Sequence, residues 1–125
     1  MRNGHKYGAV STMVEGIRFA SKAEARRYSE LCLLEKAGEI HGIVLQPGFE
    51  LAVFNRGGGL PTSIGKYVAD FAYCRCLRTP CVRSHLVYED VKGFKTPLYR
   101  WKKKHVEAQY GISITEIRMR RVRGR

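Results

Sequence analysis

A helix-start signal followed by apolar residues at helical spacing marks the N-terminal third of the chain. Ser21 and Glu24 form a capping box, in which a serine side chain and a following glutamate satisfy the free backbone N–H groups of a first helical turn. Gly38 suits the left-handed residue that ends a helix. The pattern predicts a helix over residues 22–37. Its predicted buried stripe consists of Tyr28, Leu31 and Cys32.

Apolar runs elsewhere in the chain have the length and composition of β-strands. A short hairpin is expected before the first helix, and Pro47 and Gly48 mark a turn or a strand edge between the two runs that follow it. The last run, which contains Ile112, Ile114 and Ile117, alternates imperfectly. The predicted strands cover residues 12–14, 17–19, 40–46, 49–54, 66–73, 86–92 and 112–117.

Pro97 suits the first position of a second helix, because that position needs no backbone N–H. The positions that follow predict a helix over residues 97–109, and Gly111 can end it. Its inner face is expected to carry Leu98, Trp101 and His105. Its outer face is expected to carry Arg100, Lys103, Lys104 and Glu107.

The order of the predicted elements is helix, several strands, helix, strand. An α/β fold with a mixed central β-sheet flanked by the two helices is the economical way to bury their apolar faces. One hydrophobic core serves a chain of 125 residues, so we expect residues 1–125 to form a single domain. Residues 118–125 hold five arginines and form a basic C-terminal tail.

The chain is strongly basic. Its 23 lysines and arginines against 11 acids give a formal charge of +12, which attracts polyanions and makes DNA the expected partner. The sequence shows neither a membrane span nor a signal peptide, so we expect a cytoplasmic protein without a membrane partner. The expected phosphate contacts are Arg100, Lys103, Lys104, Arg118, Arg120 and Arg121.

The two aspartates of the chain, Asp70 and Asp90, both fall inside predicted strands, where aspartate is disfavoured. They could simply face solvent or pair with basic residues. The flanking positions are apolar, however, and strand alternation places Asp90 and Lys92 on one face while Glu89 and Val91 point the other way. Two neighbouring strands would then direct two carboxylates and an ammonium group to one point. Such a group suits Mg²⁺ and a phosphate, with the lysine beside an attacking water.

This arrangement resembles the bipartite motif of the PD-(D/E)XK nuclease superfamily, an acid followed by acid-x-Lys. The first acid here is Asp70, at the end of Tyr-Val-Ala-Asp, and the second part runs from Asp90 to Lys92. Ala69 stands where the superfamily name has proline, a position that tolerates variation. Residues 17–28 and most of the remaining chain are similar to a small phage-encoded group described as a domain of unknown function.

The resemblance implies a restriction-endonuclease-like fold and a phosphodiesterase that uses Mg²⁺ or Mn²⁺ and leaves a 5′-phosphate and a 3′-hydroxyl. It also implies a third acid from the first helix. Glu24 matches that position and shares the helical stripe that faces the sheet, although its place in the capping box is a competing role. Gln46 is not expected to be a ligand.

Phage proteins of this build resemble resolvase-type endonucleases, so branched or recombination-intermediate DNA is the substrate that the resemblance suggests. A homodimer would let two sites cut two strands, although the sequence shows no clear dimer seam. A phage-encoded protein would work in the host cytoplasm.

Three cysteines and a histidine lie within twelve residues, enough donors for one tetrahedral zinc ion. Their spacing is not a standard zinc-finger pattern, and cysteine is often simply buried. The sequence is compatible with a structural zinc site and with free thiols. The residues are Cys74, Cys76, Cys81 and His85.

Two non-enzymatic functions also fit the composition. One is a non-catalytic, basic nucleic-acid-binding module whose acids are structural. The other is a zinc-stabilised adaptor that binds an acidic protein. The glycine-rich segment 56–66 is superficially similar to a phosphate loop, but the spacing of Gly59 and Gly65, and Tyr67 in place of Ser or Thr, favour a connection near DNA.

Overall fold

The short hairpin expected before the first helix is present. The structure is a computed structural model. It describes residues 11–75 and 82–119, without the side chain of Arg83. The strands β1 (Thr12–Val14) and β2 (Ile17–Phe19) pair antiparallel. Glu15 and Gly16 take the positive φ angles, 50° and 80°, that a tight two-residue hairpin turn requires.

The first helix, α1 (Lys22–Lys36), is capped as the sequence predicts. The Ser21 side chain accepts a hydrogen bond from the backbone N–H of Glu24 at 3.2 Å. At the other end Gly38 takes a φ of 78°, and its N–H donates to the Glu35 carbonyl at 3.0 Å. Both boundary predictions are confirmed to within one residue.

The central sheet is mixed and holds four strands in the order β3-β6-β7-β8. The pairs β3-β6 and β6-β7 are antiparallel, whereas β7 and β8 are parallel. Between the parallel strands the chain passes through α2 (Pro97–Tyr110), a connection of the length that parallel pairing requires. The strands of this sheet are β3 (His41–Leu45), β6 (Phe71–Cys74), β7 (Leu86–Val91) and β8 (Ile114–Ile117), with a 3₁₀ turn, η1 (Arg83–His85), before β7.

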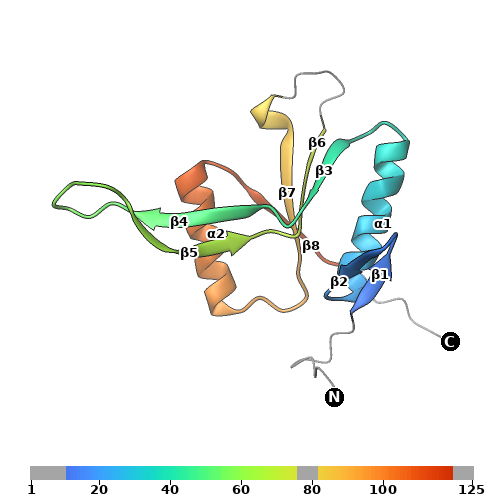
Figure 1. Cartoon of the computed structure of the whole chain (residues 1–125), viewed down its shortest axis with the longest axis horizontal. Coiled ribbons are helices and arrows are strands. Elements are labelled where there is room, and N and C mark those ends of the chain that lie inside the picture. The colour runs from blue at the N-terminus through green and yellow to red at the C-terminus, as the bar shows by residue number, and fades with distance from the viewer. Residues whose placement is uncertain (1–10, 76–81, 120–125) are drawn as a thin grey trace, which may run out of the picture.

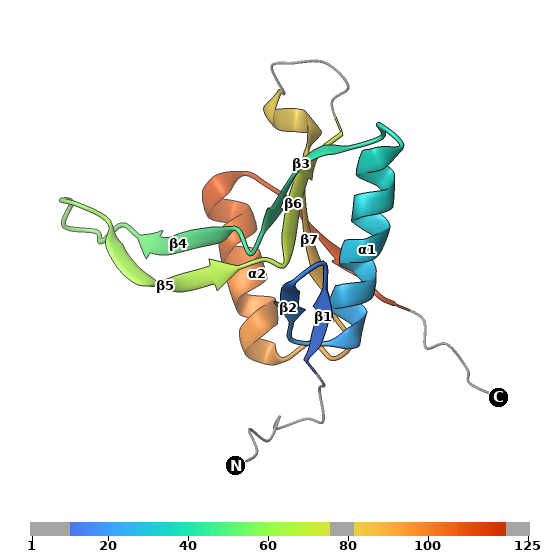
Figure 2. The ribbon, with the colours of Figure 1, turned by 45° about the vertical axis from the view of Figure 1, so that its right-hand side comes forward.

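Two strands leave the central sheet and form an arm of their own. β4 (Gly48–Val53) and β5 (Thr62–Val68) pair antiparallel, and Figures 1 and 2 show this hairpin projecting past α2. The single strand predicted over residues 66–73 is therefore wrong. The chain pairs with β4 as far as Val68, and only from Phe71 does it pair with β3 and β7.

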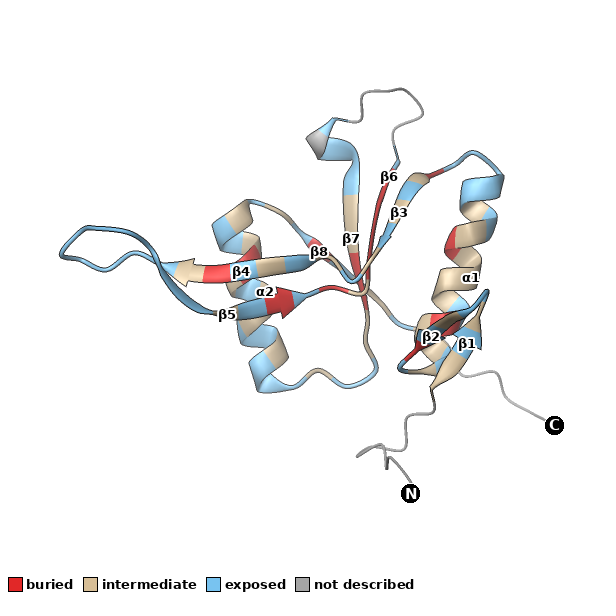
Figure 3. Ribbon diagram, viewed as in Figure 1, coloured by how far each residue is buried: buried red, intermediate tan, exposed pale blue. Residues whose placement is uncertain are grey.

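The two helices cover opposite faces of the central sheet, as Figure 1 shows, and each face has its own core. The α/β class with two flanking helices is thus confirmed. Figure 3 places the most buried residues along β6 and the end of β7. The α1 core contains Phe19, Ala25, Leu31, Ile40, Phe71 and Tyr73. The α2 core contains Leu51, Tyr67, Ala69, Val106 and Ile114.

The inner face of α2 differs from the prediction. Leu98 and Trp101 are 62% and 52% exposed, whereas Val106 is fully buried. The tyrosines of the helix pack inward, because their rings fill the core while their hydroxyls find partners: Tyr99 donates to Glu116 at 2.8 Å, and Tyr110 donates to a backbone carbonyl of β4.

Two of the four predicted outer residues of α2 also face the protein. Lys103 pairs with Glu107 at 3.2 Å, and Glu107 accepts a hydrogen bond from the backbone N–H of Ile114 at 2.8 Å. Arg100 and Lys104 are exposed, as predicted. None of the helices in the described part of the chain is long and apolar enough to cross a membrane.

Candidate active site

Asp70 lies where the chain passes from the arm into the central sheet. Its carbonyl accepts a hydrogen bond from the N–H of Gln46 at 2.9 Å, and the N–H of Ala69 donates to Pro47 at 3.0 Å. These bonds tie the two crossing segments together. Gln46 takes a φ of 51°, an uncommon backbone conformation for a residue other than glycine. The crossing thereby fixes the backbone from which the Asp70 carboxylate extends.

The two aspartates hold each other's strand ends in place. Asp90 Oδ1 accepts a hydrogen bond from the N–H of Asp70 at 3.1 Å, and Asp70 Oδ2 accepts one from the N–H of Val91 at 2.7 Å. The hydroxyl of Tyr67 donates to the other Asp90 oxygen. Each carboxylate oxygen can accept more than one bond, so the pair retains acceptor capacity. The sequence prediction that these two acids meet is confirmed.

Lys92 follows the end of β7 on the side of Asp90. Its Nζ lies 4.4 Å from the centroid of the Tyr99 ring, within range of a cation–π interaction. Its positive charge lowers the pKa values of Asp70, Asp90 and Glu24, which places the ammonium group near all three acids. The ring of Tyr99 thus lies against the ammonium group of Lys92.

Glu24 faces the sheet from the first turn of α1. It lines a cavity of about 120 Å³ together with Gln46 and Asp70. Burial and the negative charge of Asp70 together raise the pKa of Glu24 to about 7. The helix therefore brings a third carboxyl group to the aspartates, and Ser21 still caps the helix through the Glu24 backbone.

The carboxyl groups of this site have raised pKa values. Burial raises the pKa of Asp90 to about 6 and also raises the pKa of Asp70, and in both cases the charge of Lys92 acts in the opposite direction. Three carboxyl groups with raised pKa values beside one lysine mark this place as a candidate functional site. A cation at this point would stabilise their charged forms.

Glu24→Gln tests this electrostatic description. Because the folded-state pKa of Glu24, about 7, lies above the ordinary value of 4.5, its contribution to stability is present below pH 4.5 and is lost as the pH rises through 7. Glutamine does not titrate. In EDTA, the free energy of unfolding of the wild type relative to Glu24→Gln should therefore fall between those two pH values. The exposed Glu39→Gln is the matched control, and a wild-type to Glu24→Gln difference independent of pH would contradict the buried placement.

On the α1 face of β7, Glu89 forms a second buried network. Arg27 donates to both Glu89 carboxylate oxygens, at 2.9 and 2.7 Å, and the hydroxyl of Tyr73 donates to Oε2. Glu89 is 1% exposed, so the two-pronged guanidinium contact neutralises a buried charge. Glu89 and Asp90 thus serve opposite faces of one strand, as alternation predicted.

Sequence reasoning assigned no role to three residues that shape the site, Tyr67, Tyr99 and Arg27. The capping and strand signals gave no indication of their partners. Tyr67 is separated from Asp90 by 23 residues, and Arg27 from Glu89 by 62. The one available signal was the excess of tyrosine, seven in the chain, since buried tyrosine hydroxyls require partners.

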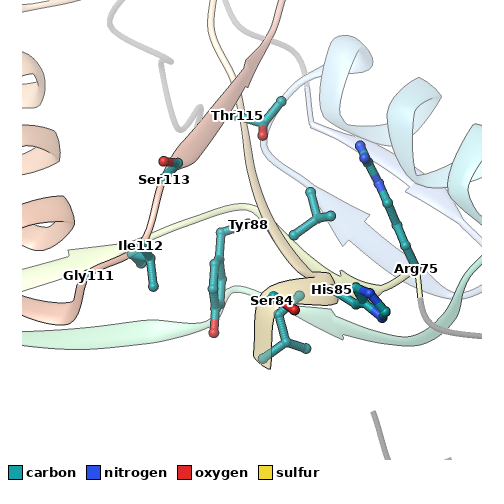
Figure 4. Close-up of a pocket in the computed structure, with 10 residues that line it drawn as sticks. Arg75, Ser84, His85, Tyr88, Gly111, Ile112, Ser113 and Thr115 are labelled. Atoms are coloured by element: carbon teal, nitrogen blue, oxygen red, sulfur yellow. The ribbon is translucent and has the colours of Figure 1, made fainter. Parts of the chain in front are cut away.

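Two further cavities border the sheet. One of about 230 Å³ lies beside Lys92, Tyr67 and Tyr99, next to the acids. The other, of about 700 Å³, lies at the opposite end of β7. Figure 4 shows Tyr88 and Ile112 on one side of it and Arg75 and His85 on the other. Its described lining holds no carboxylate and does not include Asp70, Asp90 or Glu24.

The predicted zinc site falls largely outside the described residues, which include neither Cys76 nor Cys81. Cys74 takes part in a disulfide, and His85 is exposed at the end of η1. A disulfide sulfur is not a thiolate ligand, so zinc binding by this group would require reduction first. The zinc site stays a prediction.

The predicted phosphate contacts are spread over two elements. Arg100 and Lys104 are exposed on α2, and Arg118 is exposed after β8, whereas Lys103 is engaged by Glu107. Arg120 and Arg121 lie outside the described residues. The exposed members remain available to a polyanion.

The acids do not form a ready three-ligand metal cluster. Within residues 11–75 and 82–119, no group of three or more His, Cys, Asp or Glu side chains is close enough to hold one ion. The predicted set of Asp70, Asp90 and Glu24 shares one electrostatic environment but is not gathered around one point. Two carboxylates suffice for Mg²⁺, which keeps several waters in protein sites.

A family model described as "Protein of unknown function (DUF1064)" matches residues 4–122 of this chain. No curated protein matches the sequence, and no solved structure does.

Proposed function

Given that the chain belongs to the DUF1064 family, a family of unknown function, we propose that it is a Mg²⁺-dependent DNA endonuclease of the PD-(D/E)XK type. The observation that carries the proposal is the reciprocal hydrogen bonding of Asp70 and Asp90, beside Lys92, at the junction of three strand ends. The two acids are far apart in sequence, and burial without a cation raises the pKa of each.

The residues present fit a hard divalent cation. Asp70 and Asp90 would hold Mg²⁺ or Mn²⁺ through carboxylate oxygens, the donors that these ions prefer. When bound, the ion would supply a Lewis acid to the phosphate and lower the pKa of a bound water. Glu24, which lines the same small cavity as Asp70, would accept a hydrogen bond from a water of the ion.

Lys92 has the chemistry that phosphodiester hydrolysis requires beside such a pair. Its ammonium group can donate to a non-bridging phosphate oxygen, where negative charge develops in the transition state, or to the attacking water. The Tyr99 ring restricts where the ammonium group can lie, and Tyr67 restricts Asp90. Such restriction favours catalysis, because it holds the two side chains in position before a substrate binds.

DNA is the proposed substrate because the charge of the protein favours it. The chain carries +12, and Arg100, Lys104 and Arg118 are exposed. Such residues contact phosphates and position the duplex without reading its sequence. The proposal extends to branched DNA as the preferred substrate and to a homodimer as the active enzyme.

The test is a cleavage assay on linear, nicked and four-way-junction DNA, with Mg²⁺, with Mn²⁺ and with EDTA. We expect scission with either metal, products that carry 5′-phosphates, and no scission in EDTA. Binding without scission under every metal condition would reject the nuclease and leave a non-catalytic, basic DNA-binding module.

A further inference from the structure

None of residues 53–64, the outer half of the β4–β5 arm, belongs to either of the two cores described above. Near the sheet, Leu51 and Tyr67 are buried in the α2 core. From Val53 to Ile64, by contrast, every residue is exposed, and Figure 3 shows this end of the arm in pale blue throughout. Phe54 and Leu60 are 79% and 88% exposed at its tip. Large apolar side chains on a projecting hairpin require a partner, because exposed edge strands otherwise aggregate.

The charge of the arm indicates which partner it has. Between Glu50 and Lys66 the only charged residue is Arg56, so the exposed half holds no acid. A second copy of this chain, with a charge of +12, would repel Arg56, whereas a polyanion would attract it. The tip therefore combines a single cation with apolar side chains, as do proteins that place apolar wedges between DNA bases.

The shape of the tip fits a groove. Gly57, Gly58 and Gly59 lie in the connection between the two strands, and Gly58 and Gly59 take φ angles of 85° and 94°, so this stretch of the tip carries no side chain. A two-stranded β-ribbon has the width that the DNA major groove admits. The Asn55 side chain accepts a hydrogen bond from the N–H of Gly57 at 2.7 Å and stiffens the turn.

The base of the arm is joined to the active site. β5 ends at Val68, two residues before Asp70. β4 begins directly after Pro47, whose carbonyl accepts a hydrogen bond from the N–H of Ala69. Six residue steps of β-strand reach roughly 20 Å. At 3.4 Å per base pair, that distance corresponds to about six base pairs of DNA.

We propose that the β4–β5 arm enters a DNA groove about six base pairs from the cleaved phosphate and wedges Phe54 and Leu60 against unstacked bases. The inference rests on the proposed nuclease function and deepens it. Unstacking costs least where bases are already unpaired, so the arm selects bent or branched DNA over a regular duplex. Arg56 contacts a phosphate beside the wedge.

The experiment compares two proteins that both carry Asp70→Asn in the full chain. The second, the arm variant, also carries Phe54→Ala and Leu60→Ala. Asp70→Asn keeps the DNA intact during binding. We expect the arm variant to bind a four-way junction about 10-fold more weakly, as loss of base stacking implies, with little change on a linear duplex. A 2-aminopurine base scanned along the junction arms should brighten with the intact arm only. Leu33→Ala with Met13→Ala is the matched control, because both side chains are exposed apolar positions away from the arm.

Each outcome decides the question. Equal junction affinity in the arm variant and the control would overturn the proposal. So would a wild-type dimer that becomes a monomer on loss of Phe54 and Leu60, with DNA affinity per protomer unchanged, because the arm would then be an interface between copies. A wild type that never cleaves, combined with lost junction binding in the arm variant, would reject the nuclease and uphold the arm.

Discussion

Lys92→Ala is expected to slow Mg²⁺-dependent DNA cleavage by about 10³-fold, the effect of losing a preorganised donor to transition-state charge. Asp70→Asn should have an effect at least as large, because asparagine removes the charge that a divalent cation requires. Both variants should keep most of their DNA affinity, since the exposed basic residues lie elsewhere. Single-turnover cleavage and fluorescence anisotropy measure the two quantities separately.

Lys95→Ala is the matched control for Lys92→Ala. Lys95 lies three residues further on and pairs with Glu116 at 2.8 Å, at the protein surface. Its loss should leave the cleavage rate within a factor of about two, because such surface pairs contribute little. Cleavage by Lys92→Ala at the rate of Lys95→Ala would remove Lys92 from the chemistry.

Arg27→Ala is expected to lower the free energy of unfolding by about 3–5 kcal/mol. Arg27 is 17% exposed and Glu89 is 1% exposed, so removal of the guanidinium leaves a carboxylate buried and uncompensated. The large expected effect reflects that stranded charge, and not the net strength of the ion pair. Denaturant unfolding at neutral pH measures it.

Glu30→Ala is the control, because it removes only the other carboxylate that Arg27 contacts. Glu30 is 46% exposed and lies 3.0 Å from the guanidinium, so its loss should cost less than about 1 kcal/mol. Arg27→Met combined with Glu89→Leu should recover much of the stability that Arg27→Ala loses, since neither charge then remains buried. Equal losses in Arg27→Ala and Glu30→Ala would show that the network is solvated.

Local signals in the sequence predicted the elements whose boundaries depend on a few neighbouring residues. Ser21 and Gly38 bracket α1, and Pro97 and Gly111 bracket α2, because capping uses side chains and φ angles within one turn. The meeting of Asp70 and Asp90 was also predictable, because carboxylates within two apolar strands are costly to bury unless they share polar partners.

The break in the chain before Asp70 could not be predicted in the same way. Residues 66–73 read as one apolar strand, yet the hydrogen-bonding partner changes from β4 to β3 and β7 within it. That change depends on tertiary pairing, which a period-two pattern does not report. The arm was missed for this reason.

The prediction of the inner face of α2 was wrong for a different reason. Leu98 and Trp101 are more apolar than Tyr99 and Tyr110, and a hydrophobicity pattern therefore ranks them as buried. The tyrosines are favoured inside because Tyr99 reaches Glu116 and Tyr110 reaches the Glu50 carbonyl. Such partners are separated by 17 and 60 residues and are invisible to helical periodicity.

The crossing at Ala69 and Asp70 makes the length of the arm independent of the geometry at the acids. Residues added in pairs at the glycine turn, one on each strand, would keep the inward and outward alternation of both strands and leave the crossing hydrogen bonds untouched. The length of the hairpin can therefore change while the residues at its base keep their positions. Under the proposed function, a longer arm would reach further along a duplex while the geometry of Asp70 and Asp90 stays the same.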